Sequence, residues 1–278
     1  MPSTYTPDFD LVTALQIAEG AARAAGALIR RAYYLPRKVK DKGINDLVTE
    51  TDVASERLIT DILRSAFPTH NIVAEEAGTH ANHSPDAPTW WIDPLDGTYN
   101  FVHAVPRFGV SIGCVDRDKN VLVGVVYDPM FDECFCAIQG GGATRNGEPI
   151  SVSEAMALRD SLAASGFAPD LRKTNNNRAE WSAFVERCQG MARMGSAALD
   201  MCYVASGRYD LYWEYGPTAI DRSAGTLIVM EAGGKVTDCA GNPFDVIAAP
   251  CVLASNGRVH AEAVGVLVAA RQSVGETR

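Results

Sequence analysis

Apolar residues recur at helical spacing in the first part of the chain. Between residues 9 and 34 they share one helix face, made of Leu11, Leu15, Ala18, Ala22, Ala25 and Ile29. This period predicts an amphipathic helix. A second helix is predicted from "DLVTETD" onward, with Pro68 just beyond its end. Its predicted apolar side consists of Val53, Ile59, Ile62, Leu63 and Ala66. The basic, glycine-containing stretch "LPRKVKDKGIND" is interpreted as a connection between the two helices.

Short apolar runs bounded by Asp, Asn, Gly and Pro dominate the middle of the chain. "NIVAEEAG" predicts a short strand that ends in two glutamates, and residues 79–88 have the composition of a surface loop. Further strands are predicted at "TWWI", "FGVSIGCV", "VLVGVVYD" and "ECFCAIQ". The stretch "VDRDKNV" between two of these runs predicts a hairpin.

After about residue 150 the pattern alternates between strand and helix. Strands are predicted at "SLAASGF", "YDLYWE" and "KVTDC", and helices at "RAEWSAFVERCQG", "SAALDMCYVASG" and "IDRSAGTLIVMEAGG". The end, "RQSVGETR", is expected to be frayed. The order of elements predicts an α/β layered fold with two closely packed halves, residues 1–150 and 151–278.

Composition narrows the range of functions. The 278 residues are 47% hydrophobic and 21% charged, and the formal net charge is -9. This charge argues against direct nucleic-acid binding through a broad basic face. An acidic protein that handles an anionic substrate needs a positive group such as a metal ion. The seven cysteines include no CxxC pair, which predicts reduced, mostly buried thiols in a cytoplasmic protein rather than zinc ligands or disulfides. We expect neither a signal peptide nor a membrane span.

Two carboxylates stand at the end of an apolar run in "WWIDPLDGTYNF", residues 90–101. Asp93 and Asp96 would repel each other unless a cation lay between them. Carboxylates and backbone carbonyls are ligands that Mg²⁺ prefers, and the Leu95 carbonyl lies between the pair. Gly97 and Thr98 follow, where unpaired backbone N–H groups could bind a phosphate. A plain Asp-Pro-x-Asp-Gly turn is the alternative.

Three other acidic positions lie at the ends of predicted elements. Glu75 and Glu76 end a strand, and adjacent strand residues face opposite ways, so one of the two is expected to enter a site. Asp52 and Asp221 each stand near the start of a predicted helix, where capping is the ordinary role. Four separate carboxylate positions at element ends favour a shared site over four unrelated caps. His70, His80 and His83 lie in loop-like stretches and are expected to be solvated.

The chain resembles the inositol monophosphatase family of metal-dependent phosphomonoesterases. The resemblance runs from the first helix to past residue 245 and rests on motifs that match in order. These are "DLVTETD", "AEEAG", "DPLDGTYNF", "VVYDPMFDE", "RMGSAALDMCYVASGRYDLYWE" and "IDRSAGTLIVMEAGG". It implies a layered α-β-α-β-α sandwich of the sugar-phosphatase type, usually a homodimer, that acts on a small phosphorylated polyol or sugar.

The resemblance also implies roles for particular residues. Glu75, Asp93 and the Leu95 carbonyl would hold a first Mg²⁺, and Asp93, Asp96 and Asp221 a second. Glu75 would also reach a third ion. Catalysis would fall to Glu75 and Thr98, with Asp52 behind them. The substrate-contacting positions implied by the family are Asp96, Gly97, Thr98, Gly195, Ser196, Ala197, Glu214 and Asp221.

Departures from the family pattern bear on the substrate. Ile220 stands where the family usually has Trp, Tyr99 replaces a frequent Thr, and Ala74 a common Gly. Either Lys40 or Lys42 could serve the mobile loop, and Lys42 fits the family spacing better. The resemblance favours inositol-1-monophosphatase activity and lithium sensitivity. Fructose-1,6-bisphosphatase, histidinol-phosphatase and nucleotide 3'-phosphatase activities remain alternatives, as does a role as a protein partner of the transcription machinery in ribosomal RNA synthesis.

Overall fold

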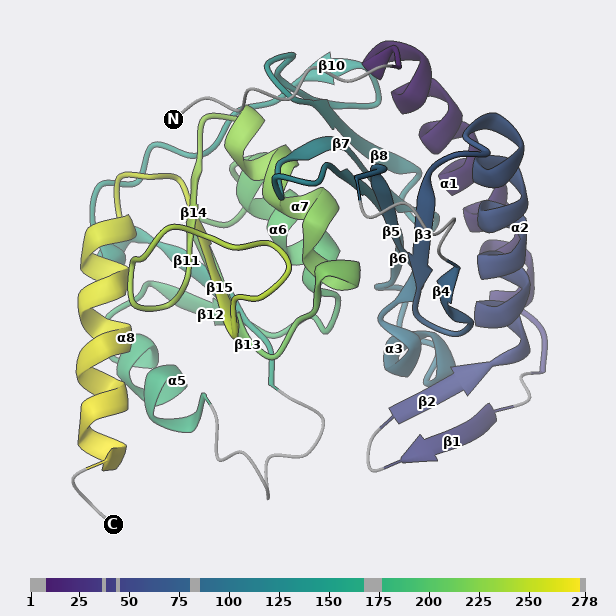
Figure 1. Ribbon diagram of the computed structural model, residues 1–278. Helices are drawn as coiled ribbons and strands as arrows, with labels where there is room; N and C mark the ends of the chain where they lie inside the picture. Colours follow the sequence, from purple (N-terminus) through teal and green to yellow (C-terminus); the bar gives the residue numbers. More distant parts are fainter. Residues whose placement is uncertain (1–8, 37–38, 44–45, 81–85, 168–176, 276–278) are drawn as a thin grey trace.

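Helices and sheets alternate in five layers in the computed structural model, which describes residues 9–36, 39–43, 46–80, 86–167 and 177–275 (Figure 1). Helices α1 (Leu11–Tyr33) and α2 (Glu50–Ala66) cover the outer face of a large sheet. Helices α6 (Ala197–Ala205) and α7 (Ala219–Glu231) lie between this sheet and a smaller one. Helices α5 (Arg178–Val185) and α8 (His260–Gly275) form the last layer. The predicted α-β-α-β-α sandwich is confirmed.

The large sheet has eight strands, and all neighbours run antiparallel except β3 and β5. Its spatial order is β10 (Glu148–Pro149), β9 (Ala143–Arg145), β8 (Glu133–Ile138), β7 (Val121–Asp128), β6 (Gly109–Val115), β5 (Thr89–Asp96), β3 (Asn71–Ala74) and β4 (Gly78–His80). Every residue of β6 and β7 is buried, because helices cover both faces of the sheet. The parallel pairing matters for the site, since it brings the carboxyl ends of β3 and β5 together.

The small sheet has five strands and carries the other half of the pocket. Its order is β12 (Gly190–Ala192), β11 (Leu162–Ser165), β13 (Leu211–Tyr215), β15 (Cys251–Ser255) and β14 (Lys235–Thr237). A separate hairpin, β1 (Val39–Gly43) and β2 (Asp46–Thr49), occupies the stretch interpreted above as a connection. Two short helices complete the described elements, α3 (Thr98–Val102) and the 3₁₀ helix η1 (Leu158–Asp160).

Hydrophobic clusters separate the layers. One lies between α1, α2 and the large sheet, a second around α6 and α7 between the two sheets, and a third between the small sheet and α5 and α8. Helix α1 contributes small residues to the first cluster, and Ala14, Ala18, Ala21 and Ala22 are fully buried. No helix among the described residues is both long and apolar enough to span a membrane. The division at residue 150 into two halves stays a prediction.

Several local predictions were wrong because packing overrode the local pattern. On α2, Val53 is 54% exposed and Ala66 is also exposed, since the buried side of this helix is largely polar. His70 is buried and accepts a hydrogen bond from the Trp90 indole at 3.1 Å. Strand β4 occupies the start of the predicted loop 79–88, whose residues 81–85 lie outside the described part of the chain.

The C-terminal region also departs from the prediction. Strand β15 and helix α8 had no predicted counterpart. Residues 271–275, expected to be frayed, continue α8 to Gly275. The helix predicted at "RAEWSAFVERCQG" is shorter than expected and ends at Val185. Beyond its end, the Cys188 N–H donates to the Phe184 carbonyl at 2.8 Å.

Helix α7 sits so close to the large sheet that two strand positions require glycine. Gly113 and Gly124 face each other on β6 and β7. A Cβ on Gly124 would lie 2.7 Å from the Ala224 carbonyl oxygen, and a Cβ on Gly113 would lie 2.2 Å from Ser223 Oγ. The helix backbone therefore rests on the sheet backbone, which holds the start of α7 in a defined place.

We expect Gly124→Ala to destabilise the protein by about 1–3 kcal/mol, because the new methyl group collides with the backbone of α7 rather than with a flexible side chain. The matched control is Gly20→Ala, an exposed α1 position where a Cβ meets nothing within 4 Å. That change should stabilise the helix by up to about 1 kcal/mol. Denaturant unfolding of both variants measures the difference, and equal stabilities would contradict the close approach.

Candidate active site

The ends of β3 and β5 place carboxylates side by side. The two strands run parallel with Ala74 opposite Ile92, so Glu75 and Asp93 follow at the same edge of the sheet. The pairing of β5 with β6 becomes irregular between Asp93 and Asp96. This irregularity allows both side chains to turn inward, and Asp93 and Asp96 are 2% and 9% exposed. The Leu95 N–H donates to Asp93 Oδ1 at 3.0 Å, which fixes that carboxylate.

Asp221 reaches the same place from α7. It is the third residue of a helix whose N-cap is Thr218, and its carboxylate accepts from the Thr218 backbone and hydroxyl. Burial and the charges of Glu75, Asp96 and Asp221 raise the pKa of Asp93 well above its ordinary range. Burial, together with Asp221, raises the pKa of Asp96 to about 6 despite opposing hydrogen bonds. The four carboxylates therefore form one electrostatic unit.

This unit suits a divalent cation. Buried like charges raise one another's pKa values, and a cation between them reverses that effect. Among the described residues, no three of these carboxylates bring one oxygen each within 4.8 Å of the other two. All potential ligands are oxygen atoms, including the Leu95 carbonyl, which matches the preference of Mg²⁺ over softer metals. The residues present therefore fit a magnesium site.

Asp52 caps a helix and contacts Thr98 at the same time. It is the third residue of α2, and Thr49 is the N-cap. Its Oδ2 accepts from the Thr49 backbone N–H at 2.8 Å, while its Oδ1 accepts from the Thr98 hydroxyl at 2.9 Å. Burial raises the pKa of Asp52, although its hydrogen bonds oppose that rise. One oxygen of Asp52 thus caps the helix and the other contacts Thr98, while the catalytic role of Asp52 stays a prediction.

Asp96 anchors the start of α6. Its Oδ2 accepts from the Ser196 hydroxyl at 2.6 Å and from the Ala198 N–H at 2.8 Å. Ser196 is 1% exposed and is the N-cap of α6. Its side chain therefore points at Asp96 and is buried, and its role as a substrate contact stays a prediction. Gly195 and Ala197, on either side of it, line the pocket.

Glu214 faces the carboxylate unit from β13. Burial, Asp221 and Asp96 raise its pKa to about 7, while a hydrogen bond from the Tyr212 hydroxyl at 2.5 Å lowers it. A Cβ on Gly166 would lie 2.1 Å from Glu214 Oε2, so a larger residue there would push this carboxylate aside. Glu214 can hold a proton near neutral pH and can donate or accept hydrogen bonds to hydroxyl groups.

A cavity of about 880 Å³ opens beside these groups, a size typical of small-ligand sites. Its walls come from both sheets and from α3, α6 and α7, so neither half of the chain forms it alone. The lining residues include Glu75, Asp96, Tyr99, His103, Phe167, Arg193, Gly195, Ala197, Glu214, Ile220 and Asp221. Gly97, the N-cap of α3, has a φ of 96°, which favours glycine. A Cβ there would lie 3.0 Å from the Arg107 carbonyl oxygen.

Sequence reasoning missed two residues that position the site. Glu56 accepts from the Glu76 and Ala77 N–H groups at 2.6 and 2.8 Å, which holds the turn that carries Glu75. Glu56 lies one helical turn after Asp52, and this spacing could have revealed it. Asn100 donates to the Arg107 and Met194 carbonyls, tying α3 to the segment before α6. Nothing in its local sequence indicates that link. The side chain of Lys42 lies outside the described residues.

Comparison with known proteins identifies the family. The profile of the inositol monophosphatase family matches residues 10–275. The chain belongs to the inositol monophosphatase family. An inositol-1-monophosphatase from Synechocystis sp. is 43% identical over 278 residues, covering 98% of this chain and 96% of the relative. The family resemblance inferred from the motifs is confirmed, and the chain is a phosphoric monoester hydrolase.

Solved structures of the family support the same assignment. An inositol monophosphatase from Anabaena (Nostoc) sp. superposes with a TM-score of 0.85 at 42% identity and covers 94% of this chain and 97% of its own. Other family relatives carry a different name. A Nus factor SuhB from Haemophilus influenzae is 43% identical over 246 residues, covering 85% of this chain and 91% of that protein.

Proposed function

We propose that this protein is a Mg²⁺-dependent inositol-1-monophosphatase that hydrolyses its substrate by direct attack of a water molecule. The observation that carries this proposal is the position of Asp93, buried beside Glu75, Asp96 and Asp221, three carboxylates that line the cavity. The similarity to the Synechocystis inositol-1-monophosphatase supports the choice of substrate. Two or three ions per site, lithium sensitivity, a homodimer and a cytoplasmic location stay predictions.

The metal ligands proposed are oxygen atoms of this chain. Glu75, Asp93 and the Leu95 carbonyl would hold one Mg²⁺, while Asp93, Asp96 and Asp221 would hold another, with Glu75 also within reach of a third. Bound Mg²⁺ neutralises phosphate charge and lowers the pKa of water. Asp96 Oδ2 already accepts two hydrogen bonds, so Oδ1 is the oxygen available to a cation. Ser196 and the start of α6 thereby orient this ligand, in the manner of other metal sites.

Thr98 and Glu75 would orient the attacking water. The Thr98 hydroxyl lies 2.9 Å from Asp52 Oδ1 and 3.0 Å from the Leu95 carbonyl oxygen. The one hydroxyl proton of Thr98 is directed toward these two acceptors. The lone pairs of the hydroxyl oxygen therefore stay available to accept a hydrogen bond from water. Glu75 and Thr98 would take the proton of the attacking water, with Asp52 behind Thr98, and a second water would protonate the departing alkoxide oxygen. No covalent phosphoenzyme is needed, since phosphoryl transfer depends chiefly on positioning and charge neutralisation.

The substrate would lie across the cavity. The backbone N–H groups of Gly97 and Thr98 are proposed to bind the phosphate, and Gly195, Ala197 and Glu214 the ring hydroxyls. Ser196 would act through Asp96, because its hydroxyl donates to that carboxylate. Ile220 lines the cavity and is smaller than Trp, which leaves more room on that wall than in most family members.

Phosphate release from a panel of esters tests this proposal. Inositol 1-phosphate, fructose 1,6-bisphosphate, histidinol phosphate and a 3'-phosphorylated nucleotide are each incubated with Mg²⁺ and with a chelator. We expect the highest kcat/KM for inositol 1-phosphate and no turnover with chelator. Turnover that survives chelation would overturn the metal mechanism. A preference for another ester would overturn the proposed substrate and keep the carboxylate site.

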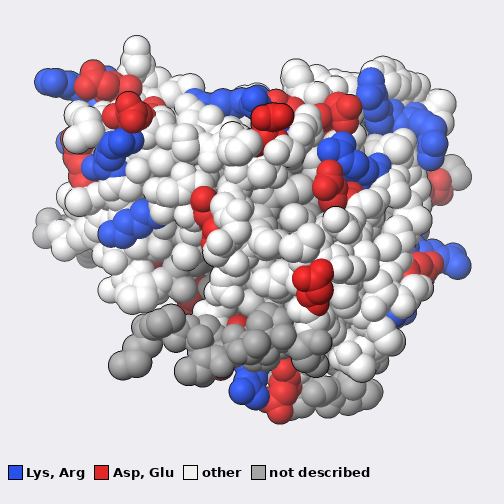
Figure 2. Space-filling view, turned by 90° about the horizontal axis from the view of Figure 1, so that it is seen from above, with Lys and Arg blue, Asp and Glu red and all other residues white. Residues whose placement is uncertain are grey.

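The relative named Nus factor SuhB supports a second candidate function, that of a protein partner in transcription. In the view of Figure 2, Lys and Arg side chains lie beside Asp and Glu side chains on the described surface. With the net charge of -9, this pattern suits protein contact better than direct RNA binding. Capture of RNA polymerase by both the wild type and an Asp93→Asn variant would support this role. Failure of both proteins to capture it would reject the role.

A further inference from the structure

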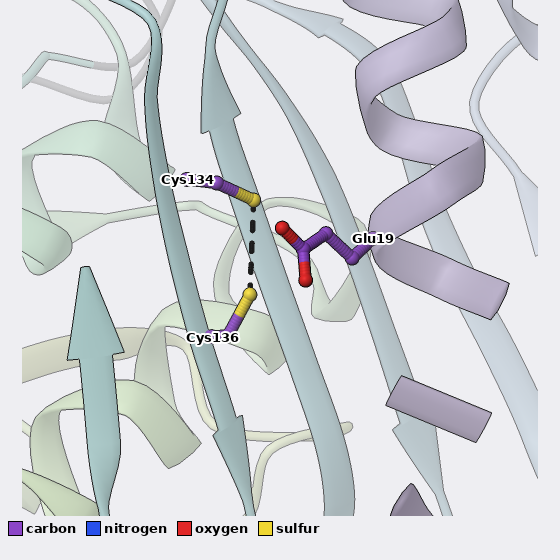
Figure 3. Close-up of side chains that lie close together, drawn as sticks. All are labelled: Glu19, Cys134 and Cys136. Atoms are coloured by element: carbon purple, nitrogen blue, oxygen red, sulfur yellow. Dashed lines mark hydrogen bonds between the residues drawn. The ribbon is translucent and has the colours of Figure 1, made fainter. Parts of the chain in front are cut away.

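Two cysteines of β8 and a glutamate of α1 lie close together where the helix packs on the strand. Cys134 and Cys136 are two residues apart on β8 and therefore point to the same face of the sheet. Their sulfur atoms lie 3.7 Å apart, and the Glu19 carboxylate of α1 points at the gap between them (Figure 3). One ligand atom from each of the three residues lies within 4.8 Å of the other two. None of the three residues belongs to the carboxylate site.

We propose that Glu19, Cys134 and Cys136 form a binding site for a thiophilic divalent cation of the zinc class. The sulfur separation supports this choice of ligand. Zinc–thiolate bonds are about 2.3 Å long, so two thiolates on one tetrahedral ion stand about 3.8 Å apart. The observed 3.7 Å matches that edge. A disulfide would need a separation of about 2.0 Å and thus a movement of the strand side chains toward each other.

Charge balance supports the site as well. Two thiolates, one carboxylate and a divalent cation carry a net charge of -1, and the Arg23 guanidinium, which also pairs with Asp132 at 3.4 Å, supplies part of the compensating charge. Its Nε lies 2.8 Å from Glu19 Oε1, so the other oxygen of that carboxylate is free of this ion pair. Such a hydrogen-bonded carboxylate is a common arrangement behind a metal ligand. On binding, the cation displaces the two thiol protons to solvent.

Neighbouring residues hold the three ligands in place, and the group is exposed to solvent on the Glu19 side. The Cys134 N–H donates to Asn146 Oδ1 at 2.8 Å, and Arg23 reaches both Asn146 and Asp132 at 3.4 Å. Cys134 is fully buried and Cys136 is 5% exposed, whereas the Glu19 side chain is 34% exposed. A cation would therefore enter past Glu19 and keep a water as its fourth ligand. Its binding would link α1 to the large sheet.

Cadmium titration tests the proposal, because Cd²⁺ bound to thiolates has a charge-transfer absorption. The reduced full-length protein is titrated with Cd²⁺ in saturating Mg²⁺, which occupies the carboxylate site. We expect one equivalent to saturate this absorption and Zn²⁺ to compete for it. Cys136→Ala should abolish the signal, and Glu19→Gln should weaken the affinity at least about tenfold. Glu19 is partly exposed, so this variant keeps the fold intact while the ligand is lost.

Cys251→Ala is the matched control. Cys251 also lies beside a second thiol, and it accepts from the Cys239 N–H at 3.1 Å. This pair has no third acidic, cysteine or histidine ligand within 4.8 Å among the described residues. The control should keep the one-equivalent signal. A wild-type protein without a saturable signal, or a signal that survives in Cys136→Ala, would overturn the proposal. The carboxylate site and the phosphatase assays are unaffected by either outcome.

Discussion

Replacing Asp93 by asparagine is expected to reduce kcat by about three orders of magnitude while the protein stays folded. Asp93 is proposed to contact both metal ions, and each lost charge interaction costs several kcal/mol of transition-state stabilisation. Asparagine keeps the size of the side chain and an oxygen that can accept from the Leu95 N–H. The loss of turnover would therefore come from the missing charge.

The same change should raise stability when no divalent cation is present. The pKa of Asp93 is raised by burial and by Glu75, Asp96 and Asp221, so its charge opposes folding in the absence of metal. Removing that charge relieves the repulsion, a trade of function for stability. Thermal unfolding in chelator, together with phosphate release in saturating Mg²⁺, measures both effects.

Asp118→Asn is the matched control for this experiment. Asp118 lies exposed in the hairpin turn between β6 and β7, so its amide variant should keep normal turnover and stability. If Asp93→Asn kept more than about a tenth of the wild-type kcat, a loss of less than about 1.4 kcal/mol, the assignment of Asp93 as a shared metal ligand would be wrong.

Replacing Arg107 by methionine is expected to cause the largest loss of stability, about 3 kcal/mol or more. Arg107 is 3% exposed and lies on the loop before β6. Its two terminal nitrogens are each 3.6 Å from a carboxylate oxygen, one of Asp128 and one of Asp200. The guanidinium also stacks on the Tyr203 ring at 3.9 Å. Methionine fills part of the space but leaves two carboxylates buried without a cation.

This destabilisation should grow with pH. Burial raises the pKa of Asp200 to about 8, although Arg107 lowers it. A carboxyl group with a raised pKa in the folded protein stabilises the fold at low pH, and that contribution is lost as pH rises toward the folded value. Without Arg107 the pKa rises further. The two folded pKa values have different effects only above about pH 8, so the variant should lose more stability at pH 9 than at pH 7, as measured by denaturant unfolding.

Two further variants make this prediction specific. Arg117→Met removes an exposed arginine whose ion pair with Asp86 spans 3.8 Å, and it should change stability by less than about 1 kcal/mol. The double variant Arg107→Met/Asp200→Asn should recover part of the loss, because one buried charge is gone. A loss for Arg107→Met of less than about 1 kcal/mol at both pH values would show that the buried pair contributes little.

Much of the fold follows from local patterns. The sequence predicted α1 from its helical period, β6 and β7 from their long apolar runs, and α7 from the glycines at its end. Each of these signals lies within the element itself. Strand β15 and helix α8 were missed: the strand is a five-residue run, and the helix lies in a small-residue stretch without a clear polar side. The buried side of α2 was also mispredicted from the spacing of apolar residues. This side is polar, because Asp52, Ser55 and Glu56 face the site rather than solvent.

The sequence by itself determined which carboxylates stand at element ends and, through their order, the family and its chemistry. Only the tertiary structure decided how each oxygen is used. Asp52 divides its two oxygens between Thr49 and Thr98, and Arg107 joins Asp128 to Asp200 across the layers. Glu19 meets a cysteine pair more than a hundred residues away. Backbone periodicity is a local property, whereas the partner of a buried polar group depends on which distant segments pack against it.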